Sequence, residues 1–254
     1  MTVLRAPLLL GLFLLLNAAQ SSADPPATLP ADGWWIRYFV TTKYLGSDDA
    51  ITMKRTYSLV GTASENGQKC RWVEMKSVET VNGKERIDVL KFLVPEKALL
   101  ENDKPLDNLI RAWRKIDDAE IEEQKFNQPL GAGGFVGSAD FLWGRDVVIF
   151  PGPQRKSNAV RENRVVEYQQ GRLDIAEGHA AKHLAERRAI TVDQKQRISF
   201  EFIFWNHKSV ALGFAAAKTR AEFHIDDVLR SAADSEWLAE DFGTGAKTSL
   251  PEAN

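Results

Sequence analysis

Residues 66–94 decide the fold, and they read NGQKCRWVEMKSVETVNGKERIDVLKFLV. Asn66-Gly67 and Asn82-Gly83 are typical of two-residue type I′ turns, which join antiparallel strands. Between these turns, side chains from residue 69 to 81 alternate as in a strand. One face carries Cys70, Trp72, Glu74 and Lys76, and the other carries Arg71, Val73, Met75 and Ser77. The stretch therefore predicts a strand that pairs with a neighbour on each side.

The pattern continues outward from this stretch in both directions. Trp34–Val40 is aromatic and β-branched, and strand composition returns at 51–62 and 86–94, which completes a four-stranded antiparallel meander over residues 34–94. Later strands are predicted at 164–169, 172–176, 198–205 and 213–225. Residues 178–190 fit a helix by their Ala, Glu, Lys and Arg content, but they also fit a strand by the alternation that ends at Ile190.

The middle of the chain differs from these strands in residue spacing and composition. Leu106, Leu109, Ile110, Trp113 and Ile116 recur at helical spacing, which predicts an amphipathic helix over residues 105–116. Residues 131–150 are rich in glycine and aromatic residues, and they are interpreted as a long loop that could cover an apolar cavity. The predicted fold class is α+β: mainly antiparallel β-sheet, a meander or half-barrel, with a central helical and Gly-rich insertion.

The first 23 residues resemble a secretory signal peptide. Arg5 precedes an uninterrupted apolar run of 11 residues, Ala6–Leu16, and small residues including Ser21 and Ala23 follow. We expect cleavage after Ala23, because a membrane-spanning helix needs about 20 apolar residues. The expected location is the periplasm or the exterior, with no stable membrane insertion after cleavage. Four segments are predicted: signal peptide 1–23, Pro-rich spacer 24–32, single β-rich domain 33–240 and disordered tail 241–254.

Composition and charge exclude several classes of protein. The chain has 254 residues, 44% of them hydrophobic, which excludes a disordered or collagen-like chain. Thirty-three Lys and Arg residues against 35 Asp and Glu residues give a net charge of -2, so no nucleic-acid partner is expected. The single cysteine, Cys70, excludes an intramolecular disulfide framework. It is interpreted as a small buried residue, with a reactive thiol beside Lys69 and Arg71 as the alternative.

Two histidines form the candidate metal site. His179 and His183 are four residues apart, so on a helix both imidazoles would share one face, as zinc binding requires. On a strand the same spacing would separate them by about 13 Å, which is too far to share a metal ion. The helical alternative would make the protein a metal-dependent hydrolase. Catalytic residues are otherwise unassigned, since the chain has no Gly-x-Ser-x-Gly nucleophile elbow.

Tryptophans supply the candidate ligand-binding residues. The chain has seven Trp and 13 Phe, and several Trp residues fall on predicted strands or in the Gly-rich loop. Such side chains could line an apolar groove, although a β-rich core uses the same residues. The candidates are Trp35, Trp72, Trp143 and Trp205. No cofactor is expected, and the expected partner is an apolar small molecule or an envelope protein.

The signal peptide, the strands Trp34–Val40 and Phe200–Trp205, and the two Asn-Gly turns resemble exported lipoprotein-carrier half-barrels of the LolA/LolB type, and also other secreted bacterial β-sheet proteins. The resemblance is architectural and implies a sheet curved around helices, with a hydrophobic ligand on its concave face. It implies no site residue. We therefore expect a secreted, non-catalytic binding or carrier module for an apolar ligand or envelope partner, rather than an enzyme. The alternatives are the hydrolase and a structural or interaction protein of the cell envelope.

Overall fold

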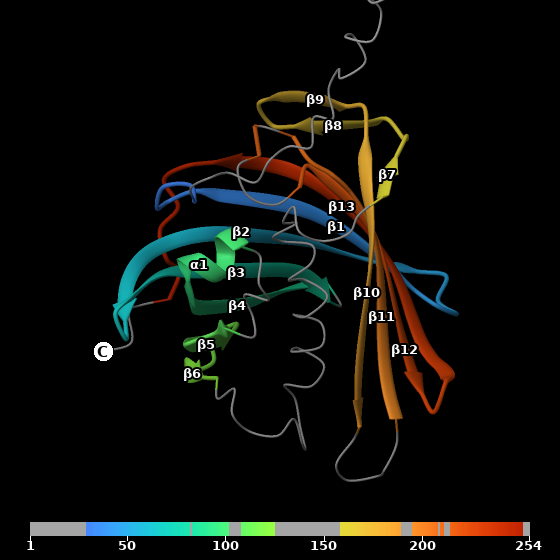
Figure 1. Ribbon diagram of the computed structural model, residues 1–254, viewed down its shortest axis with the longest axis horizontal. Helices are drawn as coiled ribbons and strands as arrows, with labels where there is room; N and C mark the ends of the chain where they lie inside the picture. Colours follow the sequence, from blue (N-terminus) through green and yellow to red (C-terminus); the bar gives the residue numbers. More distant parts are fainter. Residues whose placement is uncertain are drawn as a thin grey trace, which may run out of the picture.

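One large antiparallel sheet dominates the protein (Figure 1). The structure, a computed structural model, describes residues 29–81, 83–101, 108–124, 158–188, 195–207, 209–210 and 214–250. Among these residues, eleven strands pair in the order β6-β5-β4-β3-β2-β1-β13-β12-β11-β10-β7. Strands β6 and β7 lie at its two edges, so the sheet does not close on itself within the described chain. The prediction of a mainly antiparallel sheet is confirmed.

Four consecutive strands form the first half of the sheet. They are β1 (Trp35–Tyr44), β2 (Ala50–Glu65), β3 (Gln68–Val81) and β4 (Lys84–Pro95). Each pairs antiparallel with the next, as predicted for residues 34–94. Asn66 and Gly67 have φ of 50° and 74°, the left-handed backbone that a two-residue type I′ turn requires. Local turn chemistry therefore sets the register of β2 against β3.

The predicted helix over residues 105–116 is wrong in its described part. Residues 111–116 of this segment form strand β5 (Arg111–Ile116) instead. A short helix, α1 (Glu96–Glu101), precedes the segment, and strand β6 (Glu122–Glu123) follows it. Strand β4 is buried on both faces, so its free edge needs a hydrogen-bonding partner, and β5 supplies one. Arg114 fixes the alignment through two hydrogen bonds to Asp88, of 3.0 and 2.7 Å. The described residues contain only this one short helix, and 125–157, with the Gly-rich segment, lie outside them.

The second half of the sheet consists of later strands. They are β7 (Asn158–Val160), β10 (Gly178–Arg188), β11 (Lys195–Trp205), β12 (Ala216–Ile225) and β13 (Val228–Gly243). Residues 178–188 are thus a strand, which resolves the helix-or-strand alternative. Strand β13 pairs with β1 along ten residues of β1 and joins the two halves. A separate hairpin, β8 (Arg164–Tyr168) and β9 (Gly171–Ile175), packs against β13.

The predicted ends of the domain need correction. Strand β13 continues to Gly243, and Leu250 is buried, so residues 241–250 of the expected disordered tail are ordered. They are held by hydrogen bonds to Glu74 of β3. At the other end, Leu29 packs against the core and Asp32 forms an ion pair with Arg71, so the end of the Pro-rich spacer belongs to the domain. Residues 1–28, with the predicted signal peptide, and 251–254 lie outside the described residues.

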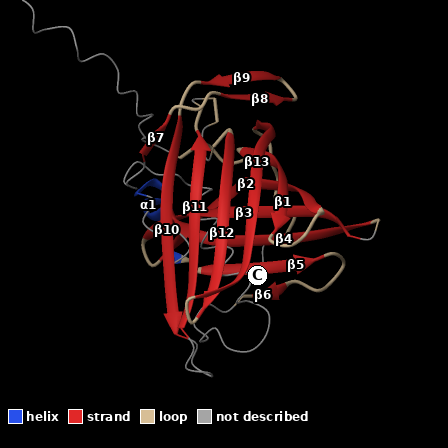
Figure 2. Ribbon diagram, turned by 90° about the vertical axis from the view of Figure 1, so that its right-hand side faces the viewer, coloured by secondary structure: helices blue, strands red, loops and turns tan. Residues whose placement is uncertain are grey.

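The sheet bends so that its two halves enclose one core. In Figure 1 the strands β10 to β12 run across the direction of β2 to β5, and Figure 2 shows the former from outside. The side chains that point into the bend come from both halves, from α1 and from the β8–β9 hairpin. We call this side the inner face, defined by Ile36, Tyr38, Val40, Tyr57, Val73, Met75, Leu90 and Trp237, and the opposite side the outer face. No described helix is long and apolar enough to cross a membrane.

Candidate functional site

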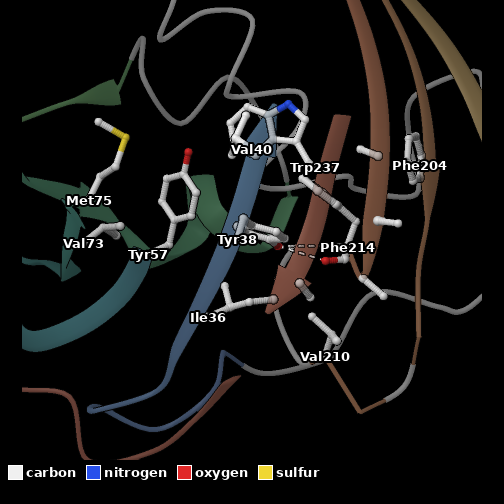
Figure 3. Packing of buried hydrophobic residues seen from close by; sticks show 14 of the residues in the cluster. Ile36, Tyr38, Val40, Tyr57, Val73, Met75, Phe204, Val210, Phe214 and Trp237 are labelled. Carbon is white, nitrogen blue, oxygen red and sulfur yellow. Dashed lines mark hydrogen bonds between the residues drawn. The ribbon is translucent and has the colours of Figure 1, made fainter. Parts of the chain in front are cut away.

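An aromatic cluster occupies the inner face where the two halves of the sheet meet (Figure 3). Tyr38 of β1 lies at its centre. Its ring stacks on Phe214 at 4.7 Å between centroids, and it meets Tyr57 and Trp237 edge-on at 6.0 and 5.9 Å. Tyr38 and Trp237 are about 200 residues apart in the sequence and lie together because β1 pairs with β13. Pairing of β13 with β1 is therefore what assembles the cluster.

The hydroxyl of Tyr38 both donates and accepts a hydrogen bond within the protein. It donates a hydrogen bond of 2.9 Å to the carbonyl oxygen of Phe214 and accepts one of 3.3 Å from the Phe214 N–H. Burial raises the pKa of Tyr38 far above its ordinary value, so the phenol stays neutral. Tyr38 is a structural centre for the cluster, because both hydrogen-bonding capacities of its hydroxyl are satisfied within the protein.

Two neighbouring polar groups differ from Tyr38 in this respect. The hydroxyl of Tyr57 and the indole Nε1 of Trp237 are buried, yet neither has a hydrogen-bond partner among the described residues. The two residues are only 3% and 4% exposed. Figure 3 shows both polar atoms on the same side of the cluster, pointing away from the strands that carry them. Buried polar groups are rarely left unpaired in folded proteins, so this pair marks the candidate site.

A buried arginine adds positive charge at the same place. Arg55 is 2% exposed, and its partner in register on β1 is Tyr38, so it shares the inner face. Its Nε donates to the hydroxyl of Ser77 at 3.0 Å, and its guanidinium lies over the ring of Trp237, 5.2 Å from the centroid. A second guanidinium nitrogen contacts the Met53 sulfur at 3.0 Å. These contacts orient the side chain.

Two inner-face carboxylates near Arg55 are paired with other arginines. Asp88 lies one strand beyond Ser77 and is held by Arg114, and the hydrogen bonds with Asp88 raise the pKa of Arg114. Glu79 follows Ser77 on the same face of β3, and it is bound by Arg86 at 3.3 Å. Both carboxylates therefore already face a positive group.

The four tryptophans chosen from the sequence are not brought together. Trp205 is fully buried at the end of β11, where its Nε1 donates to the carbonyl of Glu162 at 2.8 Å. Trp72 lies on the outer face, 4.9 Å from Trp113, as the alternation of β3 requires. Trp35 belongs to the outer set of β1 beside Gly243, and Trp143 lies outside the described residues.

The histidine pair and the cysteine have clear positions in the sheet. His179 and His183 both lie on β10, so the helical spacing behind the zinc hypothesis is not formed, and the strand spacing of about 13 Å applies to them. Among the described residues, no group of three or more His, Cys, Asp or Glu side chains could hold a metal ion. Cys70 is fully buried in β3, and burial raises the pKa of its thiol, which disfavours the reactive thiolate.

A second buried polar cluster lies on the outer face. Glu74 is 3% exposed, and its carboxylate accepts hydrogen bonds from the Thr248 hydroxyl at 2.8 Å and from the Ser249 hydroxyl at 2.6 Å. It also accepts from the Ser249 N–H at 2.9 Å. Lys91, its partner in register on β4, donates to the carbonyl of Leu250 at 3.4 Å. This cluster is closed by the protein's own C-terminal segment and offers no free group to a ligand.

Sequence reasoning missed the residues that form the inner site. One signal was present on β2, where Met53, Arg55 and Tyr57 alternate and would place an arginine on an apolar face. Trp237 gave no such signal, because its position depends on pairing with Val40, about 200 residues away in the chain. No protein-family model matches the chain, and no curated protein is significantly similar to it in sequence.

Proposed function

We propose that the protein is a non-catalytic carrier or binding module that holds an apolar ligand against the inner face of its half-barrel-like sheet. The observation that carries the proposal is the pair of buried, unpartnered donors on Tyr57 and Trp237 within an otherwise apolar surface. Binding sites for small molecules commonly combine a mainly apolar lining with a few polar groups that orient the ligand. We expect this module to act outside the cytoplasm, because the sequence predicts a signal peptide.

The chemistry of the surrounding side chains supports an apolar body for the ligand. Beside the aromatic cluster, Met75 and Val73 of β3 and Leu90 of β4 extend the inner face. Methionine adapts its shape to irregular partners, and aromatic rings supply large contact area at low entropic cost. Both properties suit a surface whose side chains can replace contacts with one another by contacts with a flexible hydrocarbon chain.

Binding of a neutral apolar probe tests the proposal. The exported protein is titrated with N-phenyl-1-naphthylamine, whose fluorescence rises in apolar surroundings, and native mass spectrometry of the protein as purified looks for a bound small molecule. We expect saturable binding of about one probe per chain. Absence of both a retained molecule and saturable probe binding would contradict the proposal.

A pair of variants on β2 tests whether the inner face is the site. Met53→Trp places a bulky ring at the partly buried margin of the inner face, whereas Thr52→Trp places the same ring at the adjacent, exposed outer position. Met53→Trp is expected to weaken probe binding about tenfold and Thr52→Trp to leave it unchanged. Equal effects of the two variants would remove the inner face from the proposal.

A further inference from the structure

We infer that the ligand of the inner face carries a carbonyl oxygen, as in a ketone or an ester, and that the Tyr57 hydroxyl and the Trp237 indole N–H recognise it by donating hydrogen bonds. The inference deepens the proposed carrier function and rests on it, because both donors lie on the face that is proposed to hold the ligand. An indole N–H can only donate, and a phenolic O–H can donate or accept. An acceptor oxygen is therefore the group that serves both residues.

Pairing of three strands brings the two donors to the flanks of one ring. Tyr57 of β2 lies in register with Ile36 of β1, and Trp237 of β13 lies in register with Val40 of β1. Tyr38 is between these two positions and meets both rings edge-on, at 6.0 and 5.9 Å between centroids. Figure 3 shows the two polar atoms on the same side of the cluster. A single extended ligand that lies across Tyr38 can thus reach both donors.

The unpaired state of the two donors is the observation that points to a ligand. Both polar atoms are buried, and neither has a hydrogen-bond partner among the described residues. If Tyr57 served packing alone, phenylalanine would fill the same space without burying a hydroxyl. The buried O–H and N–H are explained when an acceptor of a bound molecule pairs with them.

Comparable donors of this protein already pair with carbonyl oxygens. The Trp205 indole donates to the backbone carbonyl of Glu162 at 2.8 Å, and the Tyr38 hydroxyl donates to that of Phe214 at 2.9 Å. Tyr57 and Trp237 carry the same two chemical groups, but the described chain offers them no such oxygen. A carbonyl of the ligand would take the place that a backbone carbonyl has at Trp205 and Tyr38.

Burial of the donors also restricts the rest of the ligand. An oxygen that reaches them must leave water, which costs free energy that the new hydrogen bonds only partly offset. Contact of a hydrocarbon chain with the apolar side chains of the same face, such as Val73, Met75 and Leu90, supplies the remainder. The geometry therefore points to a carbonyl carried on an apolar chain rather than to a small polar molecule.

Two probes that differ only at the acceptor test the inference on the full exported protein. In 2-undecanone and 2-methyl-1-undecene the chain and the branch are the same, and a C=O group is replaced by a C=CH₂ group. Displacement of N-phenyl-1-naphthylamine measures both affinities. The double variant Tyr57→Phe/Trp237→Phe should lower the ratio of ketone affinity to alkene affinity by about tenfold. Any loss of ring contact weakens both probes alike, so the ratio isolates the hydrogen bonds.

Single variants and matched controls assign the effect to each donor. Tyr57→Phe and Trp237→Phe should each lower the ratio by about threefold, since each removes one of the two donors. The controls, Tyr168→Phe and Trp35→Phe, remove the same groups where other contacts hold the side chain. Tyr168 stacks on Phe242, and the Trp35 indole donates to the carbonyl of Thr244 at 3.4 Å. Neither control should change the ratio.

The outcomes separate the inference from the function on which it rests. If both probes bind and the double variant leaves the ratio unchanged, the carrier function stands and recognition of a carbonyl is overturned. The same conclusion follows if N-phenyl-1-naphthylamine binds and the ketone does not displace it. If neither this dye nor either probe binds, the proposed function is overturned and the inference with it.

Discussion

Buried polar groups on the outer face of the sheet have hydrogen-bond partners, whereas two such groups on the inner face have none among the described residues. On the outer face, Glu74 is surrounded by donors from Thr248 and Ser249, and the chain's own C-terminal segment closes the site. On the inner face, Tyr57 and Trp237 are equally buried, and their polar atoms have no hydrogen-bond partner in the described chain. Leaving a buried donor unpaired costs about 1–3 kcal/mol. The difference separates a face completed by folding from one that we propose is completed by a ligand.

The largest expected effect lies on the outer face, at the carboxylate of Glu74. Glu74→Ala leaves the donors of residues 248–250 without their common acceptor and should lower the free energy of unfolding by about 3 kcal/mol. Glu74→Gln keeps one acceptor oxygen, so the free energy of unfolding should fall by about half as much. Urea denaturation of both variants measures these values. A loss below about 1 kcal/mol for Glu74→Ala would show that the outer cluster does not stabilise the fold.

Packing of the C-terminal segment supplies the next effect. Leu250 is 2% exposed, and Leu250→Ala should cost about 2 kcal/mol through lost burial and the space left behind. Lys247, three residues earlier, is exposed, and Lys247→Ala serves as the control with an expected change within about 0.5 kcal/mol. Thermal or urea unfolding distinguishes the two. Equal values would mean that the segment is not docked on the outer face in solution.

The satisfied tyrosine of the inner face provides an intermediate effect. Tyr38→Phe removes the hydroxyl that both donates to and accepts from Phe214, leaving two buried backbone groups unpaired. We expect a loss of about 1–2 kcal/mol in urea denaturation. A neutral result would place Tyr38 in the same class as Tyr57 and weaken the contrast between satisfied and unsatisfied groups on this face.

These contrasts also explain which features could be predicted from sequence. The meander over residues 34–94 was predictable because Asn66-Gly67 and its neighbours encode turns and alternation locally. Strand β13 was missed because its Ala, Ser and acidic residues lack strand-like composition, and it is held by pairing with β1 at the other end of the chain. Residues 111–116 have helical apolar spacing, but the exposed edge of β4 requires a strand there.

The site was less predictable than the fold for the same reason. Single residues such as Trp72 and Trp205 were chosen by type, whereas the inner cluster depends on which strand lies beside β1. Only Arg55 and Tyr57 could be placed on one face from local alternation. Trp237 joined them through a contact between the first and last strands, which no local pattern encodes.

A smaller, pH-dependent effect extends the test of the outer face. Burial disfavours the charged form of Glu240, but hydrogen bonds from Lys54 and Arg37 outweigh it and lower the pKa of Glu240 below its ordinary 4.5. A lowered pKa contributes stability above pH 4.5, and that contribution is lost as pH falls through the folded-state pKa. Its size should stay below about 1 kcal/mol, because the side chain is partly exposed.

Glu240→Gln makes this effect measurable. The variant lacks the ionised form at every pH, so the difference in unfolding free energy between it and the unaltered protein should shrink from about pH 5 to about pH 3. Urea denaturation across this range gives the difference directly. A gap that widens on acidification would contradict the stabilising role of the ionised carboxylate.

The smallest expected effect on stability is the most informative one. Tyr57→Phe removes a buried hydroxyl that has no described partner, so the free energy of unfolding should stay unchanged or rise by up to about 1 kcal/mol. A ligand that accepts a hydrogen bond from the Tyr57 hydroxyl should then stabilise the unaltered protein more than the variant, because at a given concentration the stabilisation rises with the logarithm of the affinity for the folded state. A hydroxyl that lowers the free energy of unfolding without ligand, and raises it when ligand is bound, behaves as part of a binding site. A loss of 1 kcal/mol or more on Tyr57→Phe in the absence of ligand would instead show that the hydroxyl is satisfied by the fold, as the Tyr38 hydroxyl is.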